Sequence, residues 1–158
     1  ANASQRRLVG SEMCIRDRLR YIEKRAVVHG GGATHRMRLD DAILIKDNHL
    51  KLSKNIKKSI EISRSKYPNL MVEVEADNEQ QAIEIAKNGA DRVMLDNFSP
   101  DEATATIRKL REISDIEIEI SGGVTIENIA SYAKKADFIS LGSLTMSSLP
   151  VDFSLHVL

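Results

Sequence analysis

Polar residues suited to ligand binding follow the short apolar runs of this sequence. The ends of successive runs, with the turns after them, hold Lys46, Glu75, Asp96, Ser121, Gly122, Gly123 and Gly142. A single lysine or aspartate at such a position means little, because most are solvated caps. If the runs are parallel strands of one sheet, however, these groups all meet at its C-terminal edge, where β/α barrels carry their active sites.

Two glycine-containing turns predict a phosphate site. The turn 121–123 (Ser-Gly-Gly) precedes a helix that Thr125 can cap, and the turn 142–145 (Gly-Ser-Leu-Thr) follows the next apolar run. Glycine lets the backbone approach an anion closely, and a helix N-terminus presents unpaired N–H groups to it. One such turn alone is more often a plain loop, but the adjacent pair matches the usual phosphate site of β/α barrels.

A cluster of hydrogen-bond donors follows the glycine run 30–32. Arg36, next to His35, can grip a carboxylate with two parallel hydrogen bonds, and Lys46 can add a point charge. The alternative, which spacing alone favours, is a surface network of arginines and aspartates: Arg36, Arg38, Asp40 and Asp41. The polar run 47–49 opens a predicted helix, where such residues are more often caps than ligands, so we expect no metal site built by the protein alone.

The order of apolar runs and amphipathic helices predicts an α/β fold. Five candidate strands, 42–46, 71–76, 92–95, 116–120 and 138–141, begin roughly 20 to 29 residues apart, as successive βα units of a parallel sheet do. The helix after 92–95 is announced by a capping box of Ser99 and Glu102. Carboxylates alternate with apolar residues in 71–75 and 116–121, which favours a partial parallel β/α barrel over an open doubly wound sheet. An edge strand with one wet face would explain one such run but hardly two.

Composition excludes several classes of protein. The 158 residues have a formal net charge of zero, with 42% hydrophobic and 29% charged residues, as expected of one soluble globular domain. The balanced charge predicts neither nucleic-acid binding nor a polybasic membrane contact. No apolar run reaches membrane-spanning length, and the one cysteine, Cys14, allows no disulfide framework. We therefore expect a cytoplasmic protein.

The first 18 residues differ in character from the rest. The segment 8–18 shows no clear apolar periodicity and resembles the in-frame translation of a transposon-end adapter used in DNA library preparation. We interpret residues 1–18 as an unstructured artefact, with native sequence resuming near Leu19, and a genuine N-terminal tail is the alternative. Residues 19–158 are then expected to be the C-terminal part of a barrel in a truncated chain.

Six motifs together resemble those of the quinolinate phosphoribosyltransferases, the carboxylating nicotinate-nucleotide pyrophosphorylases. They occur in the family's order at 30–36, 45–49, 72–75, 95–98, 121–123 and 142–145. The resemblance implies a barrel of fewer than eight strands, preceded by an α+β domain and assembled as a homodimer or higher homo-oligomer. It implies transfer of the phosphoribosyl group of phosphoribosyl pyrophosphate to quinolinate with decarboxylation, using Mg²⁺, in the synthesis of NAD.

The resemblance also assigns roles to single positions. The residues that it places in the quinolinate pocket, where positive charge holds two carboxylates, are His35, Arg36 and Lys46. Glu75 and Asp96 match the carboxylates beside the ribose hydroxyls and Mg²⁺, and with Lys46 they are the expected catalytic residues. The loops expected to cradle the 5′-phosphate hold Ser121, Gly122 and Gly142.

Two departures from the family pattern affect these expectations. The family carries a Thr-Arg-Lys-Thr-x-Pro segment, whose Arg and Lys bind quinolinate, where the adapter-like stretch stands here. Met146 occupies a position that is often histidine beside the phosphate, so this contact is weaker or comes from Ser147. We expect the chain as written to be inactive.

Three alternatives remain open at this point. A related barrel phosphoribosyltransferase with another acceptor, such as a molybdenum-transport-associated homologue, would share most of the motifs. A lyase could use Lys46 as a Schiff-base nucleophile, which requires a desolvated lysine. The chain could also be a non-catalytic phosphate-binding module.

Overall fold

The computed structural model describes residues 7–10, 19–133 and 135–156. Its strands are β1 (Arg7–Gly10), β2 (Ala33–Thr34), β3 (Ile43–Ile45), β4 (Val72–Ala76), β5 (Arg92–Asp96), β6 (Glu117–Ser121) and β7 (Phe138–Leu141). Its helices are α1 (Arg20–His29), α2 (Asp47–Ser53), α3 (Ile56–Lys66), α4 (Glu79–Lys87), α5 (Pro100–Ile113), α6 (Ile129–Tyr132) and α7 (Ser143–Met146). The fold is α/β, as predicted.

All seven strands form one parallel sheet in the order β2-β1-β7-β6-β5-β4-β3. Except for β2 and β3, strands that follow one another along the chain are neighbours in the sheet, and β1 also pairs with β7. This is the strand order of a β/α barrel with one seam, between β2 and β3, where the described sheet has no pairing.

The sheet is curled rather than flat. His35, directly after β2, has Nε2 2.9 Å from Oε2 of Glu73 on β4. Four strands separate β2 from β4 in the sheet, and in a flat sheet the two would lie about 24 Å apart at the usual interstrand spacing. The contact therefore requires the partial barrel that the alternating carboxylates predicted.

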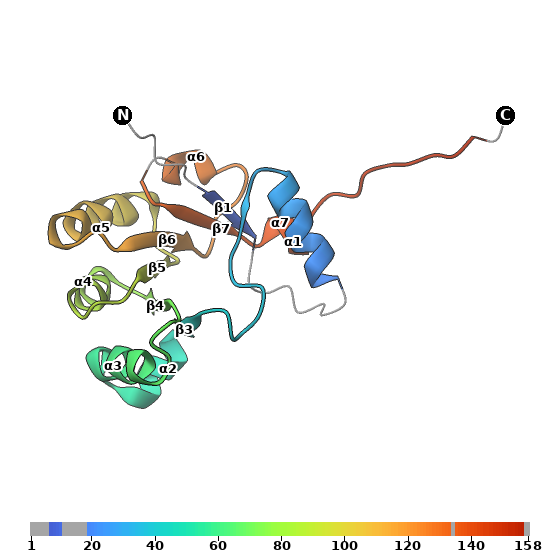
Figure 1. Ribbon diagram of the computed structural model, residues 1–158. Coiled ribbons are helices and arrows are strands. Elements are labelled where there is room, and N and C mark those ends of the chain that lie inside the picture. Colours follow the sequence, from blue (N-terminus) through green and yellow to red (C-terminus); the bar gives the residue numbers. More distant parts are fainter. Residues whose placement is uncertain (1–6, 11–18, 134, 157–158) are drawn as a thin grey trace.

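The apolar core lies outside the curled sheet, between it and the helices. Figure 1 shows α3, α4 and α5 along one face of β4, β5 and β6. The residues of these strands that join the core alternate along each strand: Val72, Val74, Ala76, Val93, Leu95, Ile118 and Ile120. Because side chains alternate across a strand, the intervening Glu73, Glu75, Arg92 and Glu119 face the barrel interior. The interior is consequently polar.

Local signals explain where the longer helices begin and end. Ser99 Oγ accepts from the backbone N–H of Glu102, and the Glu102 carboxylate accepts from the N–H of Ser99, so the predicted capping box is present on α5. The Ser99 hydroxyl also donates to the Glu102 carboxylate, and this bond, together with the one from the Ser99 N–H, lowers the pKa of Glu102. Gly89, with φ of +76°, follows the end of α4, as predicted for a C-terminal glycine.

The helix expected at Thr125 is shorter than predicted. Residues 125–128 form a turn, and α6 begins only at Ile129. The Asn128 side chain accepts from the backbone N–H of Thr125 and donates to the carbonyl of Gly123. Thr125 Oγ1 in turn accepts from the backbone N–H of Asn128, so the cap predicted at Thr125 is present although the regular helix starts four residues later.

Two short strands were not predicted from the sequence. β2 has two residues, too few for a periodic pattern. β1 lies within the segment that was expected to be unstructured, and that expectation is wrong for Arg7–Gly10, which pair with β7 and β2. The physical reason is that both neighbours would otherwise present unpaired backbone groups, which almost any extended segment can satisfy. The rest of 1–18, apart from these four residues, lies outside the described part of the chain.

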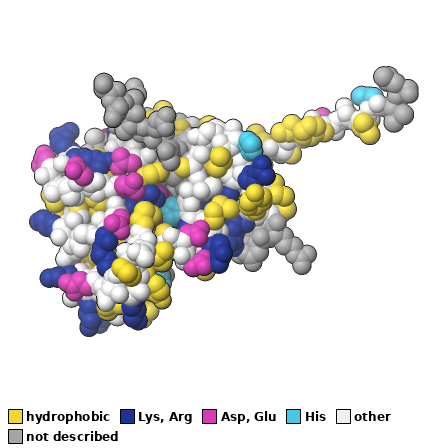
Figure 2. All heavy atoms as spheres, viewed as in Figure 1, with side chains coloured by type: hydrophobic (Ala, Val, Ile, Leu, Met, Phe, Trp, Pro, Cys, Tyr) yellow, Lys and Arg dark blue, Asp and Glu magenta, His cyan; other side chains and the backbone are white. Residues whose placement is uncertain are grey.

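The surface carries both signs of charge. On the face in Figure 2, Lys and Arg side chains are interspersed with Asp and Glu, in keeping with the zero net charge. The extended segment after α7 leads away from the barrel and carries strongly exposed apolar side chains: Leu149, Val151, Phe153 and Leu155. Within the described ranges, the helices are too short or too polar to cross a membrane.

Candidate active site at the C-terminal mouth

A cavity of about 360 Å³ lies at the C-terminal ends of the strands. Five of the residues singled out in the sequence line it together: Lys46, Ser121, Gly122, Gly123 and Gly142. The other lining residues are Met94, Glu119, Val124, Ser140, Ser143 and Met146. The structure thus brings the end of β3 together with the turns after β6 and β7.

Close packing holds the turn after β6 against the turn after β5. Gly122 has φ of +78° and Asn97 has φ of 56°, both in the left-handed region. A β-carbon on Gly122 would lie 2.8 Å from the Asn97 backbone nitrogen, closer than real β-carbons come. The backbone of Asn97 is also held in place, because its N–H donates a hydrogen bond to the carbonyl of Ser121. Glycine is therefore required at position 122 to let the two turns meet.

The turn after β7 presents hydroxyl groups. Ser143 Oγ and Thr145 Oγ1 are buried and have no hydrogen-bond partner among the residues that the structure describes. A buried hydroxyl without a partner costs free energy, so it suits a bound acceptor such as a phosphate oxygen. Ser143 lines the cavity, as does Met146, whose thioether cannot donate a hydrogen bond. Ser147 does not line it.

Lys46, directly after β3, lies beside Glu75 on the neighbouring strand β4. Lys46 Nζ lies 3.7 Å from Glu75 Oε2, with the lysine side chain 46% exposed and the glutamate 9%. Burial raises the pKa of Glu75, the Lys46 charge opposes the shift, and Asp96 and Asp47 add to it. Asp96 ends β5 in register with Ser121, and Asn97 Nδ2 donates to its Oδ2. Lysine, glutamate and aspartate thus share one end of the barrel.

His35 and Arg36 lie elsewhere. Both line a second cavity of about 580 Å³, with Arg92, Glu117 and Phe138 from the beginnings of β5, β6 and β7. Arg36 Nη1 donates to the carbonyl of Ala42. Of the surface network considered as an alternative, the Arg38–Asp40 pair is present, at 2.8 Å. The structure therefore does not place His35 and Arg36 among the residues lining the mouth cavity.

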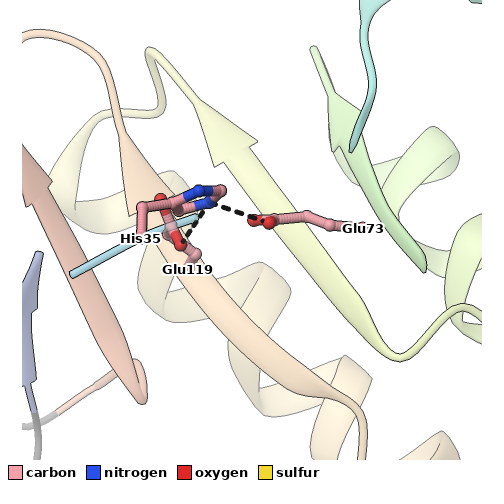
Figure 3. Close-up of side chains that lie close together, drawn as sticks. All are labelled: His35, Glu73 and Glu119. Carbon is pink, nitrogen blue, oxygen red and sulfur yellow. Dashed lines mark ion pairs between the residues drawn. The ribbon is translucent and has the colours of Figure 1, made fainter. Parts of the chain in front are cut away.

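A charged layer crosses the barrel below the mouth cavity (Figure 3). His35 Nε2 lies 2.9 Å from Glu73 Oε2 and 3.5 Å from Glu119 Oε2, and all three side chains are buried. Ser140 Oγ donates to Glu119 Oε1. Burial and the charge of Glu73 raise the pKa of Glu119 to about 7, although His35, Ser140 and Arg92 oppose the shift.

This layer is the part of the site that sequence reasoning missed. The ligand atoms of His35, Glu73 and Glu119 lie within 4.8 Å of one another, so the three residues could hold a metal ion. The sequence predicted no metal site built by the protein alone, because the polar run 47–49 was interpreted as helix caps. The sequence analysis did not consider these three residues together, since they are far apart along the chain. The available signal was the alternation of carboxylates in β4 and β6, which placed Glu73 and Glu119 in the interior without saying what they meet there.

Comparison with known proteins identifies the family. Residues 16–156 match the family model described as "Quinolinate phosphoribosyl transferase, C-terminal domain". A relative from Methanothermobacter thermautotrophicus, "Probable nicotinate-nucleotide pyrophosphorylase [carboxylating]", is 42% identical over 144 residues, covering 88% of this chain and 52% of its own. The human "Nicotinate-nucleotide pyrophosphorylase [carboxylating]" is 38% identical over 142 residues, covering 87% of this chain and 48% of its own.

Solved structures agree with the sequence relatives. The crystal structure of NadC from Streptococcus pyogenes superposes with a TM-score of 0.87 at 36% identity, covering 94% of this chain and 52% of that one. The nicotinate-nucleotide pyrophosphorylase from Francisella tularensis gives a TM-score of 0.82 at 35% identity, covering 89% and 49%. This chain spans about half the length of the curated relatives that it matches. It belongs to the quinolinate phosphoribosyl transferase family and corresponds to that family's C-terminal domain.

Proposed function

We propose that the protein carrying this domain transfers the phosphoribosyl group of phosphoribosyl pyrophosphate to quinolinate, releasing pyrophosphate and CO₂ and forming nicotinate mononucleotide. The observation that carries the proposal is the mouth cavity, which joins Lys46 to both glycine turns. One cavity thus offers a cation for a carboxylate and backbone donors for a phosphate. The membership of the family supports the choice of substrates.

The glycine turns suit the 5′-phosphate. Gly122, Gly123 and Gly142 line the cavity without side chains between their backbone N–H groups and a bound anion. Ser143 Oγ, which lacks a partner in the described structure, can donate to a phosphate oxygen. Together these groups fix one end of phosphoribosyl pyrophosphate, and this leaves the sugar between the turns and the carboxylates of β4 and β5.

The carboxylates of Glu75 and Asp96 suit the ribose and a magnesium ion. Carboxylate oxygens are ligands that Mg²⁺ prefers. Burial raises the pKa of Glu75 and the charge of Asp96 adds to that shift, so a nearby cation lowers the cost of ionising Glu75. Mg²⁺ held with phosphoribosyl pyrophosphate beside Glu75 and Asp96 would neutralise the departing pyrophosphate oxygens.

The protein's own groups position the reactants and balance their charges. Lys46 attracts a carboxylate of quinolinate and orients the ring nitrogen toward the ribose C1. As the C1–O bond to pyrophosphate breaks, positive charge develops on the sugar, and the ionised Glu75 and Asp96 stabilise it. The ring nitrogen forms the new bond to C1 and becomes cationic. The adjacent carboxylate then leaves as CO₂, its electron pair stays on the ring carbon next to the cationic nitrogen, and a proton takes its place.

The alternatives fit the site less well. A Schiff-base lyase needs a desolvated lysine, whereas Lys46 is half exposed and lies beside Glu75. A related barrel transferase with another acceptor would differ in the groups that meet the acid, and the matched relatives carry the carboxylating name. A bare phosphate-binding module would not require the paired carboxylates at the same mouth.

The proposal extends to assembly and location. A homodimer or higher homo-oligomer in the cytoplasm fits the family resemblance. Large apolar side chains of α1 are strongly exposed, among them Tyr21 and Ile22, as is Phe153 after α7. Exposed apolar side chains that gather in one patch mark a protein interaction surface. Sedimentation velocity should show an assembly larger than 17.6 kDa, and a monomer at micromolar concentration would contradict this part of the proposal.

The test of the catalytic proposal is pyrophosphate release from phosphoribosyl pyrophosphate in the presence of Mg²⁺ and quinolinate. It is measured on the full-length protein that carries this domain, because the 158-residue chain as written is expected to be inactive. Lys46→Ala should reduce kcat/KM for quinolinate by about 100-fold or more, because a charged contact to the substrate is lost. The control is Lys51→Ala, which removes an exposed pair with Asp47 and should leave the rate unchanged. Equal rates for the two variants would refute the role of Lys46.

A further inference from the structure

Asn97, directly after β5, has a left-handed backbone although it is not a glycine. Its φ of 56° is one of two positive values among the non-glycine residues that the structure describes. Asparagine adopts this region more readily than most residues, but the conformation persists only where the surroundings hold it, and such residues gather at functional sites. Asn97 lies between Asp96 and the glycine turn after β6, at the edge of the sheet that carries the candidate active site.

Three contacts from other elements hold the backbone of the turn after β5. The N–H of Asn97 donates to the carbonyl of Ser121 at 2.9 Å, which continues the pairing of β5 with β6. The carbonyl of Phe98 accepts from the buried hydroxyl of Tyr132 on α6, also at 2.9 Å. The backbone nitrogen of Asn97 packs so closely on Gly122 that it leaves no room for a β-carbon there. The backbone is therefore fixed without help from the Asn97 side chain, which is available for another role.

The Asn97 side chain binds the neighbouring carboxylate. Its Nδ2 donates to Asp96 Oδ2 at 2.7 Å. Its amide oxygen lies on the side of Gly122, within the space that a β-carbon of that glycine would need. The amide thus stands between the carboxylate at the end of β5 and the glycine turn after β6. In the hydrogen bonds of the described residues, Asp96 accepts through Oδ2 alone, so Oδ1 is left to meet a ligand.

We propose that Asn97 is a positioning residue for Asp96. Its amide determines which carboxylate oxygen turns toward the ligand, and its packing on Gly122 sets the distance between that carboxylate and the phosphate turn. The consequence for substrate rests on the proposed function. The 5′-phosphate of phosphoribosyl pyrophosphate meets the glycine turn while its ribose hydroxyls and Mg²⁺ meet Asp96, so one side chain keeps the two ends of the ligand in register.

A simpler explanation is that asparagine stands at position 97 only because it tolerates positive φ. Glycine would then serve equally well, since it adopts this region without a steric penalty. Asn97→Gly separates the two explanations, because it keeps the backbone conformation and removes the amide. Asn97→Asp keeps the size of the side chain but replaces the donor with a second carboxylate, which repels Asp96.

Steady-state kinetics of the full-length protein test the proposal. Asn97→Gly should raise KM for phosphoribosyl pyrophosphate about 10-fold and leave KM for quinolinate within about 2-fold, because groups that orient a ligating carboxylate affect what that carboxylate binds. Asn97→Asp should be impaired at least as strongly. An unchanged KM for phosphoribosyl pyrophosphate in Asn97→Gly would overturn the proposal.

Asn88 provides a matched control. Its Nδ2 also donates a hydrogen bond, at 2.8 Å to the carbonyl of Glu84, but it lies before β5 and therefore at the opposite end of the sheet. Asn88→Gly should leave both KM values within about 2-fold of the unsubstituted protein. A rise in KM for phosphoribosyl pyrophosphate equal to that of Asn97→Gly would show a general effect of losing an asparagine and would overturn the proposal.

A double-mutant cycle tests whether Asn97 acts through Asp96. In the Asp96→Asn background no carboxylate remains to be oriented, so adding Asn97→Gly should change the affinity for phosphoribosyl pyrophosphate with Mg²⁺ by less than about 2-fold. Isothermal titration measures this affinity without turnover. Losses that multiply in the double variant would show that Asn97 acts independently of Asp96, which would contradict the assigned role.

A crystal structure of Asn97→Gly tests the same role without any ligand. The backbone at position 97 should stay left-handed while the Asp96 carboxylate leaves its present orientation, and an unchanged carboxylate would overturn the proposal. Should this variant fail to fold, Asn97→Asp carries the same test, with the Asp96 carboxylate expected to turn away. If these results are as expected but quinolinate is not converted by the unsubstituted protein, the role of Asn97 stands and the proposed function falls.

Discussion

Gly122 and Asn97 approach so closely that a β-carbon at position 122 would lie 2.4 Å from the Asn97 side-chain oxygen and 2.8 Å from its backbone nitrogen. The contact joins the turns after β5 and β6 and thereby sets the wall of the mouth cavity. The side-chain oxygen could swing away, but the backbone nitrogen belongs to a residue that is itself in the left-handed region. A β-carbon at position 122 could therefore be accommodated only if the backbone of one of the two turns moved.

This relationship predicts a graded series of glycine-to-alanine effects on stability. Gly122→Ala combines the clash with positive φ and should reduce the free energy of unfolding by about 3 kcal/mol. Gly123→Ala has positive φ but open space around its β-carbon, so the loss should be about 1 kcal/mol. Gly142→Ala meets neither problem and should change stability by less than about 0.5 kcal/mol.

Urea unfolding of the three variants measures the series. Gly142→Ala is the matched control, because it lines the same cavity yet lacks both the clash and the positive φ. Equal losses for Gly122→Ala and Gly142→Ala would show that the turns are not packed as described.

Glu119 makes stability depend on pH. Its pKa rises from 4.5 to about 7 on folding, so the folded state holds a proton that the unfolded state releases between these values. The contribution is fully present below pH 4.5 and is lost as the pH rises through about 7. The loss is at most on the order of 3 to 4 kcal/mol, because one pKa unit corresponds to about 1.4 kcal/mol.

The free energy of unfolding is measured at pH 5 and at pH 7.5 for the unsubstituted chain and for Glu119→Gln. The change between the two pH values is then compared. The amide cannot titrate, so the fall with rising pH should be smaller in the variant. Glu112→Gln, an exposed glutamate on α5, serves as the control and should retain the full slope. A slope that is the same in all three proteins would contradict the assignment to Glu119.

Replacing Met146 with histidine should increase the affinity of the mouth cavity for phosphate. Its thioether lines the mouth cavity near the turn after β7 and cannot donate to a phosphate. Met146→His places a donor there that is partly charged at neutral pH, so affinity for inorganic phosphate should rise about 5-fold at pH 6 and less at pH 8. Isothermal titration at the two pH values measures this. Met146→Leu should leave affinity unchanged, and an equal gain in both variants would mean that the side chain at 146 does not reach the anion.

The elements with strong local signals could be predicted from the sequence. Strands β3 to β7 lie within one or two residues of the predicted runs, because each is a short apolar segment between caps and turns. The box of Ser99 and Glu102 is a purely local pattern and is present. The convergence of Lys46 with the two glycine turns also followed, since parallel strands bring their C-terminal ends to one edge.

What could not be predicted depends on contacts across the barrel. β1 and β2 are held by backbone pairing with neighbours and carry no periodic signal of their own. The sequence offered no sign that the His35 ring meets Glu73 and Glu119 in the barrel interior. Sequence spacing states which face of a strand a residue occupies, but the curvature of the whole sheet decides which residue it meets.

The measurement that tests the account most directly uses quinolinate labelled in the carboxylate next to the ring nitrogen. Labelled CO₂ is counted with and without phosphoribosyl pyrophosphate, in the presence of Mg²⁺, while pyrophosphate is followed in parallel. The account predicts one CO₂ for each pyrophosphate and none without phosphoribosyl pyrophosphate, because only the alkylated ring nitrogen stabilises the electron pair left behind. Pyrophosphate release without labelled CO₂, or equal turnover with an acid lacking that carboxylate, would contradict it.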